Sequence, residues 1–105
     1  MVEKVKTKNA IVRRIQKERE RLTFLGVRSI GLFGSIVRGD ETPLSDVDTL
    51  VEFITEKHTF DNFMEVAFLL EKILRRKVEL VTPESLSPHI GPHILKELER
   101  VPIAA

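Results

Sequence analysis

The chain has 105 residues, which suits one domain, and its 42% hydrophobic content is that of an ordinary globular protein rather than a disordered one. It contains 17 basic and 16 acidic residues and no cysteine, so its charge gives no general argument for nucleic-acid binding, and disulfides and thiolate metal sites are excluded. Because it shows neither an apolar stretch near the roughly 20 residues that span a bilayer nor a signal-peptide core, we expect one cytoplasmic domain over residues 1–105, without membrane contact.

The first quarter of the chain predicts a charged amphipathic helix. Residues 3–25 place apolar side chains at roughly helical spacing, and Gly26 behind them accepts the positive φ of a helix end. The apolar positions are Ile11, Ile15, Leu22 and Leu25. The β-branched and aromatic residues of Val27–Phe33 then predict a strand that leads into Gly34.

The middle of the chain predicts a turn, a second strand and a second long helix. Ile36–Gly39 fits a short helical turn, and Asp40–Ser45, which contains a proline, fits a loop. A strand is expected over Val47–Ile54, and Thr59 or Asp61 is expected to cap a helix that runs to about residue 75. That helix has an apolar stripe at i, +3, +4, +7 and +11, made of Phe63, Val66, Ala67, Leu70 and Leu74.

The last third predicts one more strand and one more helix. Lys77–Val81 reads as the third strand, and Thr82 followed by Pro83 supplies a cap with proline at the first helical position. A final helix is expected over Pro92–Arg100, with a short apolar tail from Val101. Helices and strands that alternate in this way predict a three-stranded sheet with helices packed against it.

A Gly-Ser pair stands where the first strand ends and a helical turn begins. Exposed backbone N–H groups at such a turn bind anions, Gly34 lets a phosphate approach the backbone, and the Ser35 hydroxyl adds a donor. Arg38, one turn later, can reach the same phosphates. The alternative is an ordinary strand-to-helix connection with a solvated arginine. No Walker-type Gly-Lys-Ser or Gly-Lys-Thr occurs.

Two carboxylates open the second strand. Asp46 and Asp48 are spaced i, i+2, so on a strand both point to one face with Cα atoms roughly 6.6 Å apart. Such a pair can hold one or two Mg²⁺ or Mn²⁺ ions, which prefer oxygen ligands and commonly sit between carboxylates and substrate phosphates. The alternative is that both are solvated turn residues, which the strong β propensity after Asp48 disfavours.

Together these residues form Gly34-Ser35-x10-Asp46-x-Asp48, which resembles the signature of the DNA polymerase β-like nucleotidyltransferases. Within that superfamily the chain resembles the minimal nucleotidyltransferases that pair with HEPN-domain toxins. The resemblance implies an α/β (α+β) fold with a small mixed sheet and packed helices. It also implies a third acid on a neighbouring strand. Glu79 stands where relatives usually carry Asp, and Thr49 where many carry an apolar residue.

The resemblance implies an antitoxin that uses ATP and Mg²⁺, with two ions expected, to place AMP on a hydroxyl, a tyrosine of a cognate HEPN-domain toxin. Gly34, Ser35 and Arg38 would then hold the triphosphate. Asp46, Asp48 and Glu79 would bind metal, and Glu79 would help take the acceptor's proton. Two alternatives stay open: an antitoxin that neutralises its toxin by binding alone, and a nucleotidyltransferase for small molecules.

Three weaker patterns have ordinary structural explanations. His89 and His93 have zinc-like spacing, but a Gly-Pro pair lies between them and no third ligand is evident. A run of basic residues is expected to form a solvated face at a helix end rather than a nucleic-acid patch, namely Lys72, Arg75, Arg76 and Lys77. Three aromatic residues are expected mainly in the core, or in part at a partner surface with the apolar tail, namely Phe60, Phe63 and Phe68.

Overall fold

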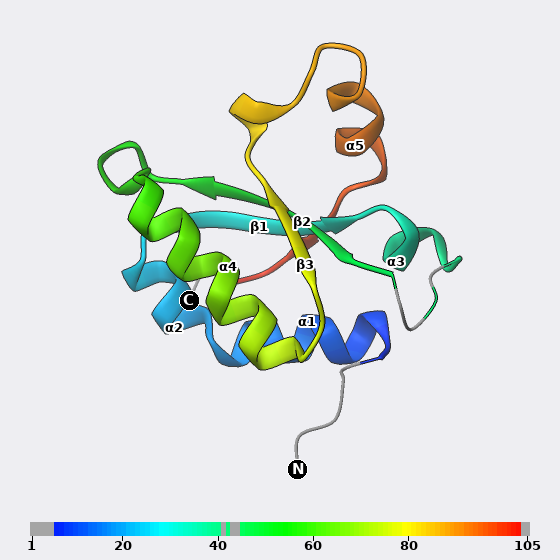
Figure 1. The fold of residues 1–105 in the computed structure, drawn as a ribbon, viewed down its shortest axis with the longest axis horizontal. Coiled ribbons are helices and arrows are strands. Elements are labelled where there is room, and N and C mark those ends of the chain that lie inside the picture. The colour runs from blue at the N-terminus through cyan, green and yellow to red at the C-terminus, as the bar shows by residue number, and fades with distance from the viewer. Residues whose placement is uncertain (1–5, 41, 43–44, 104–105) are drawn as a thin grey trace.

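A computed structural model describes residues 6–40, 42 and 45–103 of the chain. Four strands form one mixed sheet in the order β3-β2-β1-β4 (Figure 1). The strands are β1 (Val27–Phe33), β2 (Val47–Phe53), β3 (Val78–Val81) and β4 (Glu99–Val101). β1 pairs antiparallel with both β2 and β4, and β2 pairs parallel with β3. The expected mixed sheet with packed helices is therefore confirmed.

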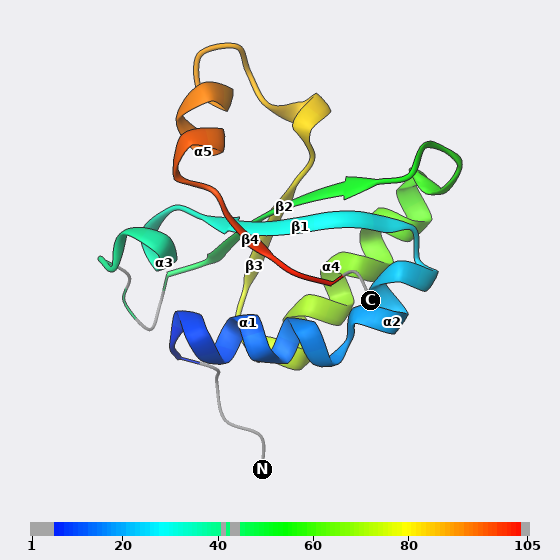
Figure 2. The ribbon, with the colours of Figure 1, turned by 180° about the vertical axis from the view of Figure 1, so that it is seen from behind.

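Five helices accompany the sheet in the described part of the chain. They are α1 (Lys8–Lys17), α2 (Arg19–Phe24), α3 (Ser35–Arg38), α4 (Phe60–Leu74) and α5 (Gly91–Glu97), with single 3₁₀ turns η1 (Thr55–Lys57) and η2 (Pro83–Ser85). α1, α2 and α4 lie on one side of the sheet, whereas α5 and η2 lie on the other (Figures 1 and 2). None of the helices that the structure describes is long and apolar enough to cross a membrane.

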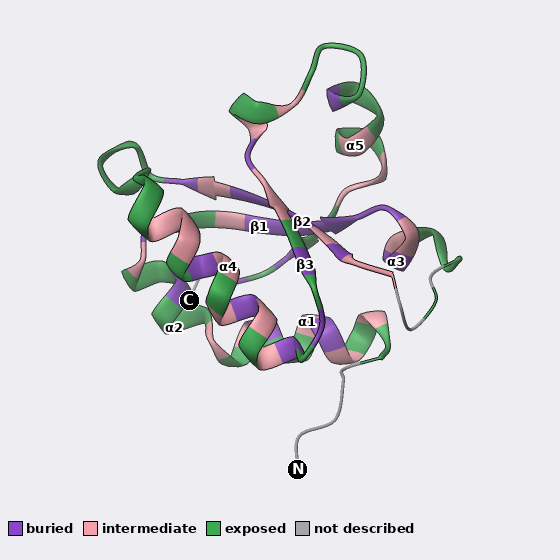
Figure 3. Ribbon diagram, in the orientation of Figure 1, coloured by how far each residue is buried: buried purple, intermediate pink, exposed green. Residues whose placement is uncertain are grey.

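The core fills the space between the sheet and the helices α1, α2 and α4 (Figure 3). The predicted stripe of α4 faces this core, since three of its members are fully buried and the other two are partly buried. The buried three are Val66, Leu70 and Leu74, and they share the core with Ile11 and Ile15 of α1. Thr59 caps α4, because its Oγ1 accepts a hydrogen bond from the Asn62 amide at 3.1 Å.

Two boundaries differ from the expectation. The single helix over residues 3–25 is wrong: Thr7 caps α1, and Glu18, with φ −101° and ψ 16°, separates α1 from α2. Residues 3–5 of that expected helix lie outside the described part. Across this break Ile15 and Leu22 are both completely buried. Gly26, with φ +93°, adopts the expected positive φ behind α2.

The three-stranded sheet is also wrong. The last helix ends at Glu97 instead of continuing to Arg100, and the next residues form β4, whose Val101 pairs with Ile30 of β1. Val101 and Ile103 are buried, so this part of the apolar tail belongs to the core rather than to a partner surface, while residues 104–105 lie outside the described part. Three residues are too short for an alternating pattern to be visible in the sequence.

Two expectations about side chains fail as well. Arg76, expected on a solvated face, is only 7% exposed, because its Nη2 donates to the carbonyl oxygens of Ser45 (2.8 Å) and Thr42 (3.3 Å). Phe60 and Phe68, expected in the core, are 76% and 58% exposed on α4, whereas Phe63 packs against the core. Phe68 lies off the apolar stripe of α4, whereas Phe60 is the first residue of the helix and lies at its end.

Candidate active site

The turn after β1 depends on glycine. Gly34 has φ +76° and ψ −152°, a backbone region that is essentially closed to residues with a Cβ atom. A Cβ atom built on Gly34 would also collide with the carboxylate oxygen Oδ2 of Asp48. The turn backbone and the Asp48 carboxylate are therefore in direct contact, which is possible only because residue 34 lacks a side chain.

Strand pairing brings the acids together. Asp48 lies opposite Phe33 of β1 on one side and opposite Glu79 of the parallel strand β3 on the other. Asp46 lies immediately before β2, two residues from Asp48. All three predicted acids therefore gather at the same part of the sheet, beside the Gly34 turn.

The electrostatics of this cluster are unfavourable for a bare carboxylate. Partial burial raises the pKa of Asp48 to about 6, and the neighbouring charges of Glu79, Asp46 and Glu97 contribute to the rise, while the charge of Arg38 opposes it. A cation bound among these oxygens would remove the repulsion. The donor set consists of carboxylates alone, which fits Mg²⁺ or Mn²⁺ rather than zinc.

No three His, Asp or Glu side chains within residues 6–40, 42 and 45–103 lie close enough together to form a complete protein metal site. Mg²⁺ does not require one, since it is usually held by one or two carboxylates together with waters and substrate phosphates. The residues that fit this role are Asp48 with Asp46 or Glu79.

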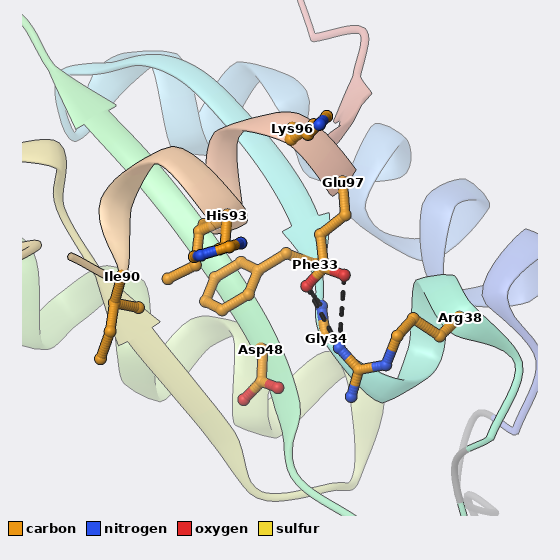
Figure 4. A pocket seen from close by; sticks show the side chains of 9 residues that line it. Phe33, Gly34, Arg38, Asp48, Ile90, His93, Lys96 and Glu97 are labelled. Carbon is orange, nitrogen blue, oxygen red and sulfur yellow. Dashed lines mark hydrogen bonds and ion pairs between the residues drawn. The ribbon is translucent and has the colours of Figure 1, made fainter.

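An anion-binding position lies next to the acids. The Gly34 amide donates a hydrogen bond to Oε1 of Glu97 at 2.9 Å, and Nη1 of Arg38 lies 3.2 and 3.3 Å from the two oxygens of the same carboxylate (Figure 4). The hydrogen bond that Arg38 donates to Glu97, followed by the charge of Asp40, raises the pKa of Arg38. The turn and the arginine therefore already hold a negatively charged group.

The anion position opens into a cavity of about 550 Å³ between the ends of β1 and β2 and helix α5. Of the residues predicted from the sequence, Gly34, Arg38 and Asp48 line it, whereas Ser35, Asp46 and Glu79 do not belong to its lining. The sequence interpretation missed the rest of the lining: Phe33, Ile90, His93, Ile94, Lys96 and Glu97 (Figure 4). Most of these come from α5 and the residue before it, and no local motif indicates that this helix faces the Gly34 turn.

Hydrogen bonds from the Arg76 side chain fix the backbone that precedes Asp46. Besides the two hydrogen bonds that Arg76 donates, the Thr42 amide donates to Oγ of Ser45 at 2.9 Å. Ser45 is the direct neighbour of Asp46, so Arg76 fixes the backbone from which this acid projects.

We expect Gly34→Ala to lower the free energy of unfolding by at least about 2 kcal/mol, because the residue must leave its backbone region and also push Asp48 aside. Gly39→Ala is the matched control. Gly39 also has a positive φ, +83°, but its Cβ would meet nothing within 4 Å, so only about 1 kcal/mol should be lost. Urea denaturation measures both. Equal losses would show that the approach of Gly34 to Asp48 is unimportant.

Residues 11–101 match the nucleotidyltransferase domain family. The protein adenylyltransferase MntA of Thermococcus cleftensis is 44% identical over 73 residues, which cover 70% of this chain and 73% of that protein. MJ1379 of Methanocaldococcus jannaschii, assigned as a protein adenylyltransferase, is 42% identical over 74 residues, which cover 70% of this chain and 71% of that one.

Solved structures agree. One assigned as a minimal nucleotidyltransferase superposes with a TM-score of 0.69 at 26% identity and covers 84% of this chain and 93% of that chain. A chain of the MntA–HepT toxin–antitoxin complex shares the fold with a TM-score of 0.62 at 21% identity, over 90% of this chain and 71% of that chain. The family match spans most of the sequence. The chain therefore belongs to the nucleotidyltransferase domain family, as a minimal nucleotidyltransferase similar to MntA.

Proposed function

We propose that this protein is an antitoxin that transfers AMP from ATP to a tyrosine hydroxyl of a HEPN-domain toxin. One observation carries the proposal: the Gly34 amide and Arg38 hold an anion in the same cavity that Asp48 lines. A phosphate-binding position beside a carboxylate cluster is the arrangement that nucleotidyl transfer requires, because triphosphate and metal must bind next to each other.

In this proposal the phosphates of ATP bind at the Gly34–Ser35 turn and Arg38. Mg²⁺, or Mn²⁺ in its place, would be held by Asp48 together with Asp46 or Glu79 and would supply charge neutralisation for the triphosphate. The acceptor hydroxyl oxygen forms a bond to the α-phosphorus, the bond between the α-phosphorus and the bridging oxygen breaks, and pyrophosphate leaves. Glu79 takes the hydroxyl proton.

The chain and its relatives support a protein acceptor. The sequence contains no tyrosine, so an AMP linked to tyrosine must lie on another protein. Relatives at 42–44% identity are named as protein adenylyltransferases. One structure that shares the fold is a complex of an MNT antitoxin with a tri-AMPylated HEPN toxin of Shewanella oneidensis. These names support a HEPN-domain protein as the acceptor.

Incubation of the protein with ATP, Mg²⁺ and its HEPN partner, followed by intact-mass spectrometry, tests the proposal. We expect the partner's mass to increase by whole AMP units, and tandem spectra to place each AMP on tyrosine, with no increase in the mass of this chain. Toxin inhibition without any mass increase would instead indicate an antitoxin that acts by binding alone. Transfer to small hydroxyl compounds in the absence of a partner would indicate a small-molecule enzyme.

A further inference from the structure

The Glu97 carboxylate lies at the position where, in the proposed function, a phosphate of ATP binds. This glutamate is the last residue of α5 and comes from the opposite side of the sheet to α1 and α4, yet its carboxylate reaches both predicted anion donors (Figure 4). We infer that Glu97 is an affinity-determining residue, whose carboxylate competes with a nucleotide phosphate for the Gly34 amide and Arg38. This inference rests on the proposed function.

The competition follows from the number of donors. Gly34 has a single amide proton, which it donates to Oε1 of Glu97 at 2.9 Å. The Nη1 group of Arg38 lies within 3.3 Å of both carboxylate oxygens. A phosphate that takes the Gly34 amide must displace Glu97 from it, because one N–H group makes one good hydrogen bond.

The position of the Glu97 carboxylate reflects a balance between repulsion from the neighbouring acids and attraction to its two donors. Asp48 lies close enough for the charge of Glu97 to raise the Asp48 pKa, so the carboxylate is placed against electrostatic repulsion from the acid cluster. Within the part of the chain that the structure describes, the Gly34 amide and Arg38 are the groups that donate to its carboxylate. Glu97 thus satisfies the anion donors, and it adds negative charge beside the position that a triphosphate would take.

Competition has a defined effect on affinity. If Glu97 covers the Gly34 amide and Arg38 in most molecules, nucleotide binds only to the fraction of molecules in which they are uncovered. The apparent dissociation constant of nucleotide then equals the intrinsic constant divided by that fraction. A role for Glu97 as a metal ligand predicts the opposite sign, since its removal would then weaken the binding of nucleotide with Mg²⁺. The two roles are therefore distinguished by the direction of one change.

Calorimetry with ATP, in the presence and in the absence of Mg²⁺, tests the inference on the wild-type protein, Glu97→Gln and Glu65→Gln. The last is a matched control, because Glu65 is an exposed residue of α4 on the far side of the sheet. We expect Glu97→Gln to bind ATP about tenfold more tightly than wild type under both conditions. Glu65→Gln should bind as wild type does.

The Gly34 amide resonance gives a second measurement that does not depend on nucleotide. In Glu97→Gln its proton should move upfield, because a charged acceptor is replaced by a neutral one. Unchanged or weaker ATP binding by Glu97→Gln, or an unmoved Gly34 resonance, would overturn the inference and leave the proposed function intact. If neither wild type nor Glu97→Gln binds ATP, the proposed function fails, and the inference fails with it.

Discussion

Asp48→Asn is expected to abolish transfer and, at neutral pH, to make the protein more stable. The loss of activity, about 10³-fold or more, reflects the loss of a charged metal ligand next to the triphosphate, and nucleotide binding with Mg²⁺ should weaken as well. Asp46→Asn should lose activity in the same way. The gain in stability arises because the folded protein holds the Asp48 carboxylate, partly desolvated, beside Glu79, Asp46 and Glu97.

The pH dependence of that gain follows from the pKa. Because the pKa of Asp48 is raised from 3.8 to about 6, the folded protein binds the proton more tightly than the unfolded chain does. Wild-type stability is therefore reduced above pH 6, and this reduction disappears as the pH falls from about 6 to 4. After a discount for solvent screening, we expect Asp48→Asn to gain about 1 kcal/mol above pH 6 and nothing near pH 4.

Thermal or urea denaturation across this pH range, without added metal, measures the effect. Asp61→Asn makes the same chemical change at an exposed aspartate of α4 and should give no gain at any pH. A loss of stability in Asp48→Asn at pH 8 would contradict the repulsion that the structure indicates. Retention of full transfer activity would remove Asp48 from the metal site.

Glu79→Gln is expected to slow transfer by about 10²- to 10⁴-fold, the range for loss of a general base, while ATP binding stays nearly intact. The geometry supports this division of work, because Glu79 is exposed and does not belong to the cavity lining, whereas Asp48 lines it. Glu79→Asp, which restores the acid that the superfamily usually carries, should stay active. Single-turnover transfer rates and ATP affinities, measured side by side, separate the two roles.

Glu84→Gln provides the matched control, since Glu84 lies in the 3₁₀ turn that follows the same strand and is exposed. Its transfer rate should equal that of wild type. Equal rates for wild type and Glu79→Gln would show that Glu79 has no catalytic role. An inactive wild type together with an active Glu79→Asp would identify the protein as an antitoxin that acts by binding.

Local sequence patterns were sufficient where a structural element depends on its own residues. The strand Val27–Phe33, the glycine turn and the stripe of α4 are of this kind, because period, cap and breaker residues lie side by side in the chain. The pairing of Asp48 with Glu79 followed from the resemblance rather than from a pattern, since strand order is a property of the whole sheet. The catalytic and metal-binding roles of the site residues stay predictions.

Features that depend on distant partners could not be predicted. β4 exists because three residues add to the free edge of β1, and their own sequence carries no strand pattern. Arg76 is buried because carbonyl oxygens more than 30 residues earlier in the chain accept its hydrogen bonds. Glu97 reaches Gly34 across 63 residues, a separation at which no spacing rule applies.

The junction between α5 and β4 has a consequence for the rate at which nucleotide binds. Only Leu98 separates Glu97 from β4, and its side chain lies against Gly31, where an added Cβ would come within 2.8 Å of it. With the helix end anchored in this way, Glu97 leaves the donors by rotation of its own side chain, which takes picoseconds to nanoseconds. The exchange of Glu97 between covering and uncovering the Gly34 amide and Arg38 is then a rapid equilibrium that precedes each encounter with nucleotide. Glu97 therefore lowers the association rate constant of nucleotide in proportion to the covered fraction and leaves the dissociation rate constant unchanged.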